Sequence, residues 1–422
     1  MPRADVVVVG AGLAGLTCAA ALAERGASVF LAAKGMATTH WTHGGLDIAA
    51  PAGAVTPRDG VRLLAEQGWH PYARLSGAVM DAVDEHRARL AGSGLEPLGT
   101  LDSPLRPIPT ALGALRPGAL LPAGQAAALE PWGGEGLLVL GFQRYRDAWP
   151  AYAARNLRQV AWTDGPAEIR ALEVDLPWVD RLHNLNPRSL AILFDDPVWR
   201  TRALRAMADA MPSGRWRIGL PAVLGIGEHP AVLAEAEAAL GHRVYEMPSL
   251  PPSVPGMRLF DALRQRILAA GGRIQIGFDV VEVERQGRTI IAIHTEAAAR
   301  TLRLAGDRFV LATGGIAGEG IRAHRDGRLE ERVFGLPVTA PPPDAWFSDD
   351  PLIPHPIESL GITVDGSLRP VDADGAPLLD NVTVIGSALA GMRYLEQRCG
   401  DGVALASAHL VAAALAGERA AA

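Results

Sequence analysis

The chain has 422 residues, more than one ordinary hydrophobic core holds, and so predicts two domains. Its net charge of −6 disfavours nucleic acid as a partner, because phosphate binding needs a basic face. Two cysteines without a Cys-x-x-Cys pair exclude a disulfide scaffold, a cysteine-based zinc site and an iron–sulfur cluster held by this chain alone. We therefore expect no metal site and a reducing, cytoplasmic location.

The chain begins with a predicted strand and a glycine turn. Residues 5–10, DVVVVG, contain a run of β-branched valines, as in a parallel strand that is buried on both faces. Gly10, Gly12 and Gly15 follow at the G-x-G-x-x-G spacing, which permits a tight turn, close approach of the backbone to a phosphate and close packing of helix on strand. A glycine-rich turn in an unrelated α/β protein is the alternative, which the strand–turn–helix context disfavours.

A small-residue helix over residues 16–25 is predicted to direct its N-terminus at that phosphate, and Gly26 ends it. Residues 28–31 form the second strand. The same apolar stretch is long enough for a signal peptide or a membrane span. The regularly spaced glycines and the polar residues that follow favour the helix, so we expect no direct membrane span.

Ala33 stands where a dinucleotide-binding protein ends its second strand on an acid that holds the adenosine ribose. Alanine cannot accept a hydrogen bond from a hydroxyl. Either the adenosine of FAD is held in another way, or the ligand lacks adenosine, as FMN does. Lys34, the next residue, is the exception among side-chain cations that are otherwise arginine. We attribute this preference for arginine to codon bias.

Three later stretches complete this pattern. Residues 35–50 are small, polar and glycine-rich, which suits close backbone approach to a planar ring. Residues 263–316 predict a helix, a strand, a hairpin around Gln286–Gly287, and a further strand that leads into FVLATGG. Residues 361–421 predict two short strands, a glycine turn and a long helix. We expect two domains, a discontinuous one at 1–50 plus 254–422 and an inserted one at 51–253.

Six stretches are similar to a known flavoprotein family: GLAGLTCAAALAERG (12–26), LPAVLGI (220–226), LPPSVPGMRL (250–259), LATGG (311–315), LRPVDADG (368–375) and GSALAG…EQRCGDGVALASA (386–408). The chain resembles flavoprotein dehydrogenases of the fumarate reductase and aspartate oxidase type, and most closely the B subunit of anaerobic glycerol-3-phosphate dehydrogenases. The resemblance implies an α/β fold. It predicts a Rossmann-type flavin-binding domain of the glutathione reductase and fumarate reductase kind, with an inserted α/β substrate domain.

The resemblance also implies a cofactor and partners. The family is credited with FMN, and FAD is the alternative. The implied substrate is sn-glycerol 3-phosphate, and the implied partners are a second flavoprotein subunit and an iron–sulfur membrane-anchor subunit. The chain would be cytoplasmic, held at the inner face of the cell membrane through these subunits.

The candidate cofactor residues follow predicted strands or precede the last helix: Gly10, Gly12, Gly15, Lys34, Gly44, Gly45, Thr313, Gly314, Gly386, Ser387, Gly400, Asp401, Gly402 and Val403. The N-terminus of the last helix is expected to stabilise negative charge on the flavin pyrimidine. The alternative at Gly400–Gly402 is an ordinary turn with Asp401 as the helix cap. Simple turn chemistry is the alternative for the residues after the strands.

The catalytic candidates are His43, Arg258 and Arg325. Imidazole has a suitable pKa for the base that takes an alcohol proton, and a hydrogen-bonded structural histidine is the alternative. Arginine suits a phosphate clamp, although most arginines in such a chain are solvated surface.

Three functions remain open at this point. The first is the flavin subunit of a quinone-linked glycerol-3-phosphate dehydrogenase, which oxidises glycerol 3-phosphate to dihydroxyacetone phosphate by hydride transfer to flavin. The second is a non-catalytic flavin subunit that transfers electrons. The third is a self-sufficient FAD oxidoreductase like fumarate reductase or aspartate oxidase.

Overall fold

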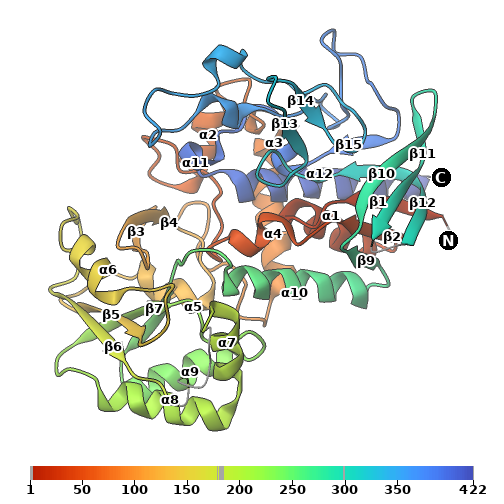
Figure 1. The fold of residues 1–422 in the computed structure, drawn as a ribbon. Helices are drawn as coiled ribbons and strands as arrows, with labels where there is room; N and C mark the ends of the chain where they lie inside the picture. Colours follow the sequence, from red (N-terminus) through yellow and green to blue (C-terminus); the bar gives the residue numbers. More distant parts are fainter. Residues whose placement is uncertain (1–2, 178, 180–184, 298–299, 422) are drawn as a thin grey trace. The chain divides into compact units, whose positions relative to one another are not determined.

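The computed structural model describes residues 3–177, 179, 185–297 and 300–421 (Figure 1). The first unit contains Met1–Thr39, Asp47–Arg89 and Phe260–Ala422, and the second unit contains His40–Leu46 and Leu90–Leu259. Each unit has its own parallel sheet, as the predicted α/β class requires. The unit boundaries differ from the expected ones mainly at residues 51–89, which lie in the first unit and not in the insertion.

The first unit is built on a parallel sheet whose strands have the order β15-β12-β1-β2-β9. The strands are β1 (Ala4–Val9), β2 (Val29–Ala33), β9 (Arg273–Ile276), β12 (Arg300–Leu311) and β15 (Val382–Val384). β1 and β2 are aliphatic and almost fully buried, as strands of a sheet covered on both faces are.

β12 also continues into an antiparallel ribbon with β11 (Thr289–Ala297) and β10 (Asp279–Gln286). The predicted hairpin is confirmed, and its Gly287 takes φ +60°, a left-handed conformation that glycine adopts without steric cost.

Two helices rich in alanine pack against each other in the first unit: α1 (Leu13–Glu24) and α12 (Gly400–Ala421). Small side chains allow this close packing. Within the described residues, Gly400–Glu418 is the one stretch long and apolar enough to cross a membrane, and 56% of it is buried inside the structure. Buried core helices of soluble proteins can be equally long and apolar, so this finding is weak evidence for a membrane span.

Residues 51–89 belong with the first unit because their helical segments pack on its other helices. They form α2 (Pro57–Ala65), α3 (Tyr72–Leu75) and α4 (Val79–Leu90). Glu85 of α4 contacts both Arg25 and His409. Thr56 and Asp59 form a reciprocal capping box at the start of α2. The contacts of Glu85 join segments far apart in the chain, so the placement of residues 51–89 could not be read from composition.

The remaining elements of the first unit are short: η1 (Ala37–Trp41), η2 (Ser76–Ala78), β13 (Ile321–Ala323), β14 (Leu329–Glu331), η5 (Pro343–Ala345), η6 (Pro356–Ser359), η7 (Gly386–Ala388) and α11 (Tyr394–Gln397). Helix α10 (Val254–Ala269) contains the unit boundary, after Leu259.

The second unit has a smaller parallel sheet with the strand order β6-β5-β7-β8. Its strands are β5 (Gly136–Phe142), β6 (Ile169–Val174), β7 (Trp216–Pro221) and β8 (Arg243–Met247), beside a hairpin of β3 (Arg106–Pro109) and β4 (Leu115–Gly118). Its helices are α5 (Ala123–Ala126), η3 (Ala127–Leu129), α6 (Pro150–Leu157), α7 (Pro187–Asp195), α8 (Pro197–Asp209) and α9 (His229–Leu240). Two hydrophobic clusters pack on this sheet.

Candidate functional site

The glycine turn between β1 and α1 has the shape that a bound phosphate needs. Gly10 has φ +115°, and a Cβ there would lie 2.3 Å from the Ala312 carbonyl oxygen. A Cβ on Gly15 would lie 2.1 Å from the Gly10 oxygen, whereas one on Gly12 would come no nearer than 3.8 Å to Ala37 Cβ. Among the described residues no side chain caps α1, and its first turn holds no acid. The helix N-terminus is therefore available to an anion.

Strands β12 and β15 end next to this turn, and they bring four predicted cofactor residues together. Gly386 has φ +68°, and a Cβ there would lie 2.7 Å from Ala14 Cβ of α1. A Cβ on Gly314 would lie 3.2 Å from Ser387 Oγ. Thr313 Oγ1 is buried and has no hydrogen-bond partner in the part of the chain that the structure describes. This hydroxyl is a ready donor or acceptor for a ligand at the carboxyl edge of the sheet.

The N-terminus of α12 is occupied by a loop of the same unit. The amides of Asp401 and Gly402 donate to the Asp47 carbonyl oxygen at 3.1 and 3.2 Å, and Asp401 Oδ2 accepts from the Asp47 amide at 2.9 Å. A Cβ on Gly402 would lie 2.0 Å from the Tyr72 hydroxyl. These amides hold the loop at Asp47, which disfavours our expectation that they face a flavin. Cofactor contact by Gly400–Val403 stays a prediction.

Beside this helix start lies a buried pair that the local sequence does not mark. His70 Nδ1 accepts from the Tyr72 amide at 3.0 Å, and its Nε2 lies 3.6 Å from Cys399 Sγ. Burial lowers the pKa of His70 to about 4 and raises the pKa of the Cys399 thiol. Both groups are therefore neutral at pH 7, and the pair supplies neither a thiolate nor an imidazolium.

The end of β2 carries no ribose acceptor. Ala33 is 4% exposed, and its carbonyl oxygen accepts from the amides of Gly277 and Phe278 at 2.9 and 3.0 Å. Lys34 turns outward, and its Nζ lies 2.6 Å from Glu319 Oε2. Glu319 could not be predicted as this partner, because it lies in a loop 285 residues away along the chain.

His43, Gly44 and Gly45 lie in the second unit. The Gly45 amide donates to His43 Nδ1 at 3.2 Å, and Gln125 Nε2 donates to the His43 carbonyl oxygen. Gly44 has φ +102°, and a Cβ there would lie 2.6 Å from Pro255 Cβ. Because Nδ1 accepts this hydrogen bond, the neutral His43 ring carries its proton on Nε2.

The Arg258 side chain is hydrogen-bonded to other residues of the second unit. Its Nη1 and Nη2 donate to Glu246 at 2.6 and 2.9 Å, and its Nε donates to the Gly225 carbonyl oxygen at 2.7 Å. Arg258 and Glu246 are 4% and 1% exposed, and His229 Nε2 lies 3.8 Å from Glu246 Oε2. This geometry argues against Arg258 as a substrate clamp. The charge of Arg258 and its place in the sequence suit a clamp, whereas its bidentate carboxylate partner is visible only in three dimensions.

Arg325 lies in the turn between β13 and β14 and is exposed. It does not line the first-unit cavity that Trp69, Arg74 and Arg393 border. The proposed catalytic role of Arg325 stays a prediction, and the contacts of this turn give it no additional support.

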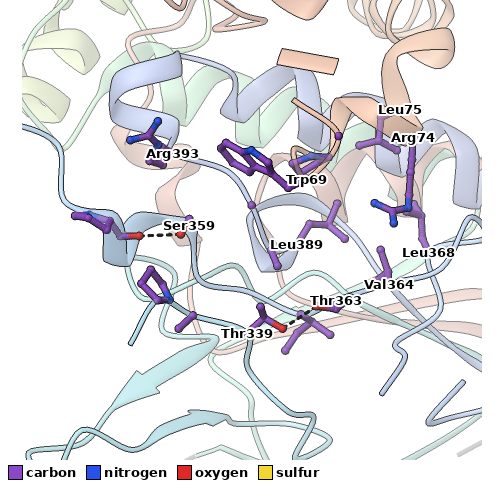
Figure 2. Close-up of a pocket in the computed structure, with 18 residues that line it drawn as sticks. Trp69, Arg74, Leu75, Thr339, Ser359, Thr363, Val364, Leu368, Leu389 and Arg393 are labelled. Carbon is purple, nitrogen blue, oxygen red and sulfur yellow. Dashed lines mark hydrogen bonds between the residues drawn. The ribbon is translucent and has the colours of Figure 1, made fainter. Parts of the chain in front are cut away.

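That cavity has a volume of about 600 Å³ (Figure 2). Its walls combine apolar side chains with the indole of Trp69 and two arginines, Arg74 and Arg393. The Thr339 and Thr363 hydroxyls meet at 2.7 Å on another wall. The wall also includes residues 389–390, which follow η7 directly, so the chain that leaves β15 reaches the cavity a few residues later. Arg74 was not predicted, because nothing in its local sequence distinguishes it from a surface arginine.

The sheet order, the glycine turn and the ends of β12 and β15 define a flavin-binding α/β protein. A family model described as an FAD binding domain matches residues 5–403. Proteins named as the B subunit of anaerobic glycerol-3-phosphate dehydrogenase are similar over nearly the whole chain. The one from Pectobacterium atrosepticum is 34% identical and covers 97% of this chain and 98% of its own. The one from Halobacterium salinarum, named as probable, is 32% identical and covers 98% of each. The chain belongs to this family of oxidoreductase subunits.

Among solved structures, 3-ketosteroid delta1-dehydrogenase from Sterolibacterium denitrificans aligns with a TM-score of 0.46 and 12% identity over 99% of this chain and 100% of its own. A flavocytochrome c3 fumarate reductase aligns with a TM-score of 0.45 and 10% identity over 99% of this chain and 78% of its own.

The residues of the first unit fit a flavin. The glycine turn packs tightly at Gly10 and Gly15, where a Cβ would collide with backbone, and it is open at Gly12, while Thr313 offers a buried hydroxyl. Within the described residues, no group of three or more His, Cys, Asp and Glu side chains could hold a metal.

Proposed function

We propose that this chain is the FMN-containing subunit of a quinone-linked sn-glycerol-3-phosphate dehydrogenase. The observation that carries the proposal is the glycine turn before α1, which is open at Gly12 and has no side-chain cap among the described residues, in a chain that aligns with 98% of a relative named as the B subunit of such an enzyme. The relatives' names include a subunit letter, so we further propose partner subunits, a second flavoprotein and an iron–sulfur membrane anchor. The chain would then lie at the cytoplasmic face of the membrane through those partners.

The bound flavin supplies a hydride acceptor for C2 of the substrate. The chain's own residues bind the substrate and orient it. We propose that the cavity of the first unit receives the phosphate end of glycerol 3-phosphate, with Arg74 and Arg393 as the cations. Arg74 is exposed, and Arg393 Nη1 lies 3.0 Å from Glu396 Oε2, with both side chains partly exposed. Such an ion pair is weak and can exchange for a phosphate.

His43 is the remaining candidate for proton transfer. A base that uses Nε2 needs that nitrogen unprotonated in the neutral ring, but the Gly45 amide already donates to Nδ1. The contact therefore disfavours His43 as the base.

A second function has specific support. Arg258 is bonded internally, and His43 is held in the tautomer that does not suit a base. Two of the three predicted catalytic groups are thus engaged elsewhere. A flavin subunit that passes electrons, with the substrate oxidised on its partner, fits both observations.

The test is an assay of the purified chain alone with glycerol 3-phosphate and an artificial electron acceptor. Turnover, or bleaching of the flavin absorption by substrate in the absence of acceptor, supports the catalytic proposal and excludes the purely accessory one. Turnover that requires the partner subunit, with no bleaching before it is added, supports the accessory function.

The same preparation identifies the cofactor. Heat releases the flavin, and its mass distinguishes the two forms. FMN supports the proposal. FAD favours instead a self-sufficient oxidoreductase of the fumarate reductase type.

A further inference from the structure

A chain of ion pairs runs along the carboxyl edge of the first unit's sheet. Lys34 follows β2, and its Nζ lies 2.6 Å from Glu319 Oε2, in the loop after β12. Arg332, just after β14, has Nη1 at 4.0 Å from the same Glu319 oxygen and donates from Nη2 to Asp279 at 3.0 Å. Asp279 is the first residue of β10, three residues after β9 ends. We call these four residues the edge chain.

The position of the edge chain follows from the strand order. β12 and β2 are not neighbours, because β1 lies between them. The Lys34–Glu319 pair therefore joins the segments that follow two strands on either side of β1. Two strand spacings make a span of about 10 Å, within reach of one lysine and one glutamate side chain. A dinucleotide with its phosphates at the start of α1 extends its adenosine half past the end of β2. That route and the Lys34–Glu319 pair both start at the carboxyl end of β2.

Two further features distinguish the end of β2 from a site that binds an adenosine ribose: the missing acceptor at Ala33 and the type of cation at residue 34. Ala33, at the end of β2, is 4% exposed and carries no acceptor, and its carbonyl oxygen is already bonded to two amides. Lys34 is the only lysine among the 40 lysine and arginine residues of the chain. A lysine ammonium is a compact point charge with three donors, which suits the end of a phosphate, whereas arginine presents a planar fork.

The pair can exchange partners. The side chains of Lys34 and Glu319 are 55% and 65% exposed, and an exposed ion pair is only weakly stabilised. The hydrogen bond from Lys34 lowers the pKa of Glu319, so this carboxyl is ionised at neutral pH.

We propose that the Lys34–Glu319 pair selects a flavin mononucleotide. Lys34 leaves Glu319 to bind the terminal phosphate, which carries about −1.5 to −2 charges as a monoester at pH 7. The Glu319 carboxylate then lies where the second phosphate of a dinucleotide would pass, and repels it. The inference rests on the proposed flavin function, and it assigns Glu319 a role in rejecting FAD, which is selectivity through an unfavourable contact.

The test is a titration of the flavin-free full chain with riboflavin, FMN and FAD. Binding is measured by the quenching of flavin fluorescence. Lys34→Met is expected to weaken FMN binding roughly tenfold and to leave riboflavin binding unchanged, because riboflavin has no phosphate. Glu319→Gln is expected to narrow the preference for FMN over FAD by about fivefold. The matched controls are Arg3→Met and Asp307→Asn, which break an exposed pair near the amino end of β1, at the opposite edge of the sheet.

A second readout uses the single lysine. Reductive methylation followed by mass spectrometry of the peptide with Lys34 is expected to show protection by FMN and none by riboflavin. Equal losses of FMN and riboflavin affinity in Lys34→Met, or an unchanged FMN to FAD ratio in Glu319→Gln, overturn the inference. A wild-type chain that prefers FAD overturns it too and leaves the flavin function intact. A wild-type chain that binds no flavin overturns the proposed function itself.

Discussion

Replacing Arg258 with methionine separates a structural role from a substrate-binding one. The guanidinium makes two charged hydrogen bonds to Glu246 and one to the Gly225 carbonyl oxygen, all inside the second unit. Methionine fills much of the same volume but leaves Glu246, which is 1% exposed, without its cation. Burial opposes ionisation of Glu246, while Arg258, His229 and the Leu224 amide lower its pKa below the usual value. An ionised carboxylate that loses its partner in the interior must be protonated or hydrated.

The magnitude follows from the burial of both partners. Removing one partner of a buried pair costs about 3–5 kcal/mol. For a unit of this size that corresponds to a drop of about 10 °C in the unfolding temperature. Removing both charges with Arg258→Met and Glu246→Leu is expected to restore part of the loss, because no unpaired charge remains. The control is Arg243→Met, since Arg243 and Glu130 form an ion pair that is 48% and 43% exposed and is expected to contribute under about 1 kcal/mol.

The measurements are urea unfolding of the full chain and the KM for glycerol 3-phosphate in the assembled complex. We expect Arg258→Met to unfold at clearly lower urea concentration, and the double variant to recover. A variant that keeps its unfolding midpoint within the range of Arg243→Met and raises KM instead would refute the structural role and return Arg258 to the substrate clamp.

Three more predictions use the first unit. The pKa of His70 is about 4 in the folded chain against 6.5 for a free histidine, so its contribution to stability is full above pH 6.5 and falls by about 3 kcal/mol toward pH 4. As the pH is lowered, the urea unfolding midpoint should therefore fall less steeply in His70→Gln than in wild type or in the control His242→Gln. An equally steep fall in His70→Gln would contradict the lowered pKa of His70. Gly402→Ala places a Cβ 2.0 Å from the Tyr72 hydroxyl, which should cost about 2 kcal/mol in urea unfolding, with part regained in combination with Tyr72→Phe. Arg74→Met should raise the KM for glycerol 3-phosphate about tenfold with little change in unfolding, and a normal KM would remove the cavity from the substrate path.

The sequence by itself determined the glycine turn, the buried strands on either side of α1, the hairpin at Gly287 and the flavoprotein family. These features depend on residue type at short spacing: glycine where a Cβ would meet backbone, and β-branched residues in strands covered on both faces. It also located the ends of β12 and β15, because a glycine soon after an aliphatic run marks a strand that ends at a turn.

Only the tertiary structure decided which polar groups are free to act. Arg258 and Lys34 are both cations close to the boundary of a helix or strand, yet one is sealed against Glu246 and the other lies exposed beside Glu319. The partners lie 12 and 285 residues away, and neither separation has a sequence signature. The amides of α12 were likewise expected to be open and instead hold Asp47. Local pattern reports what a backbone segment does alone, whereas the availability of a charge or an amide depends on which distant segment packs against it.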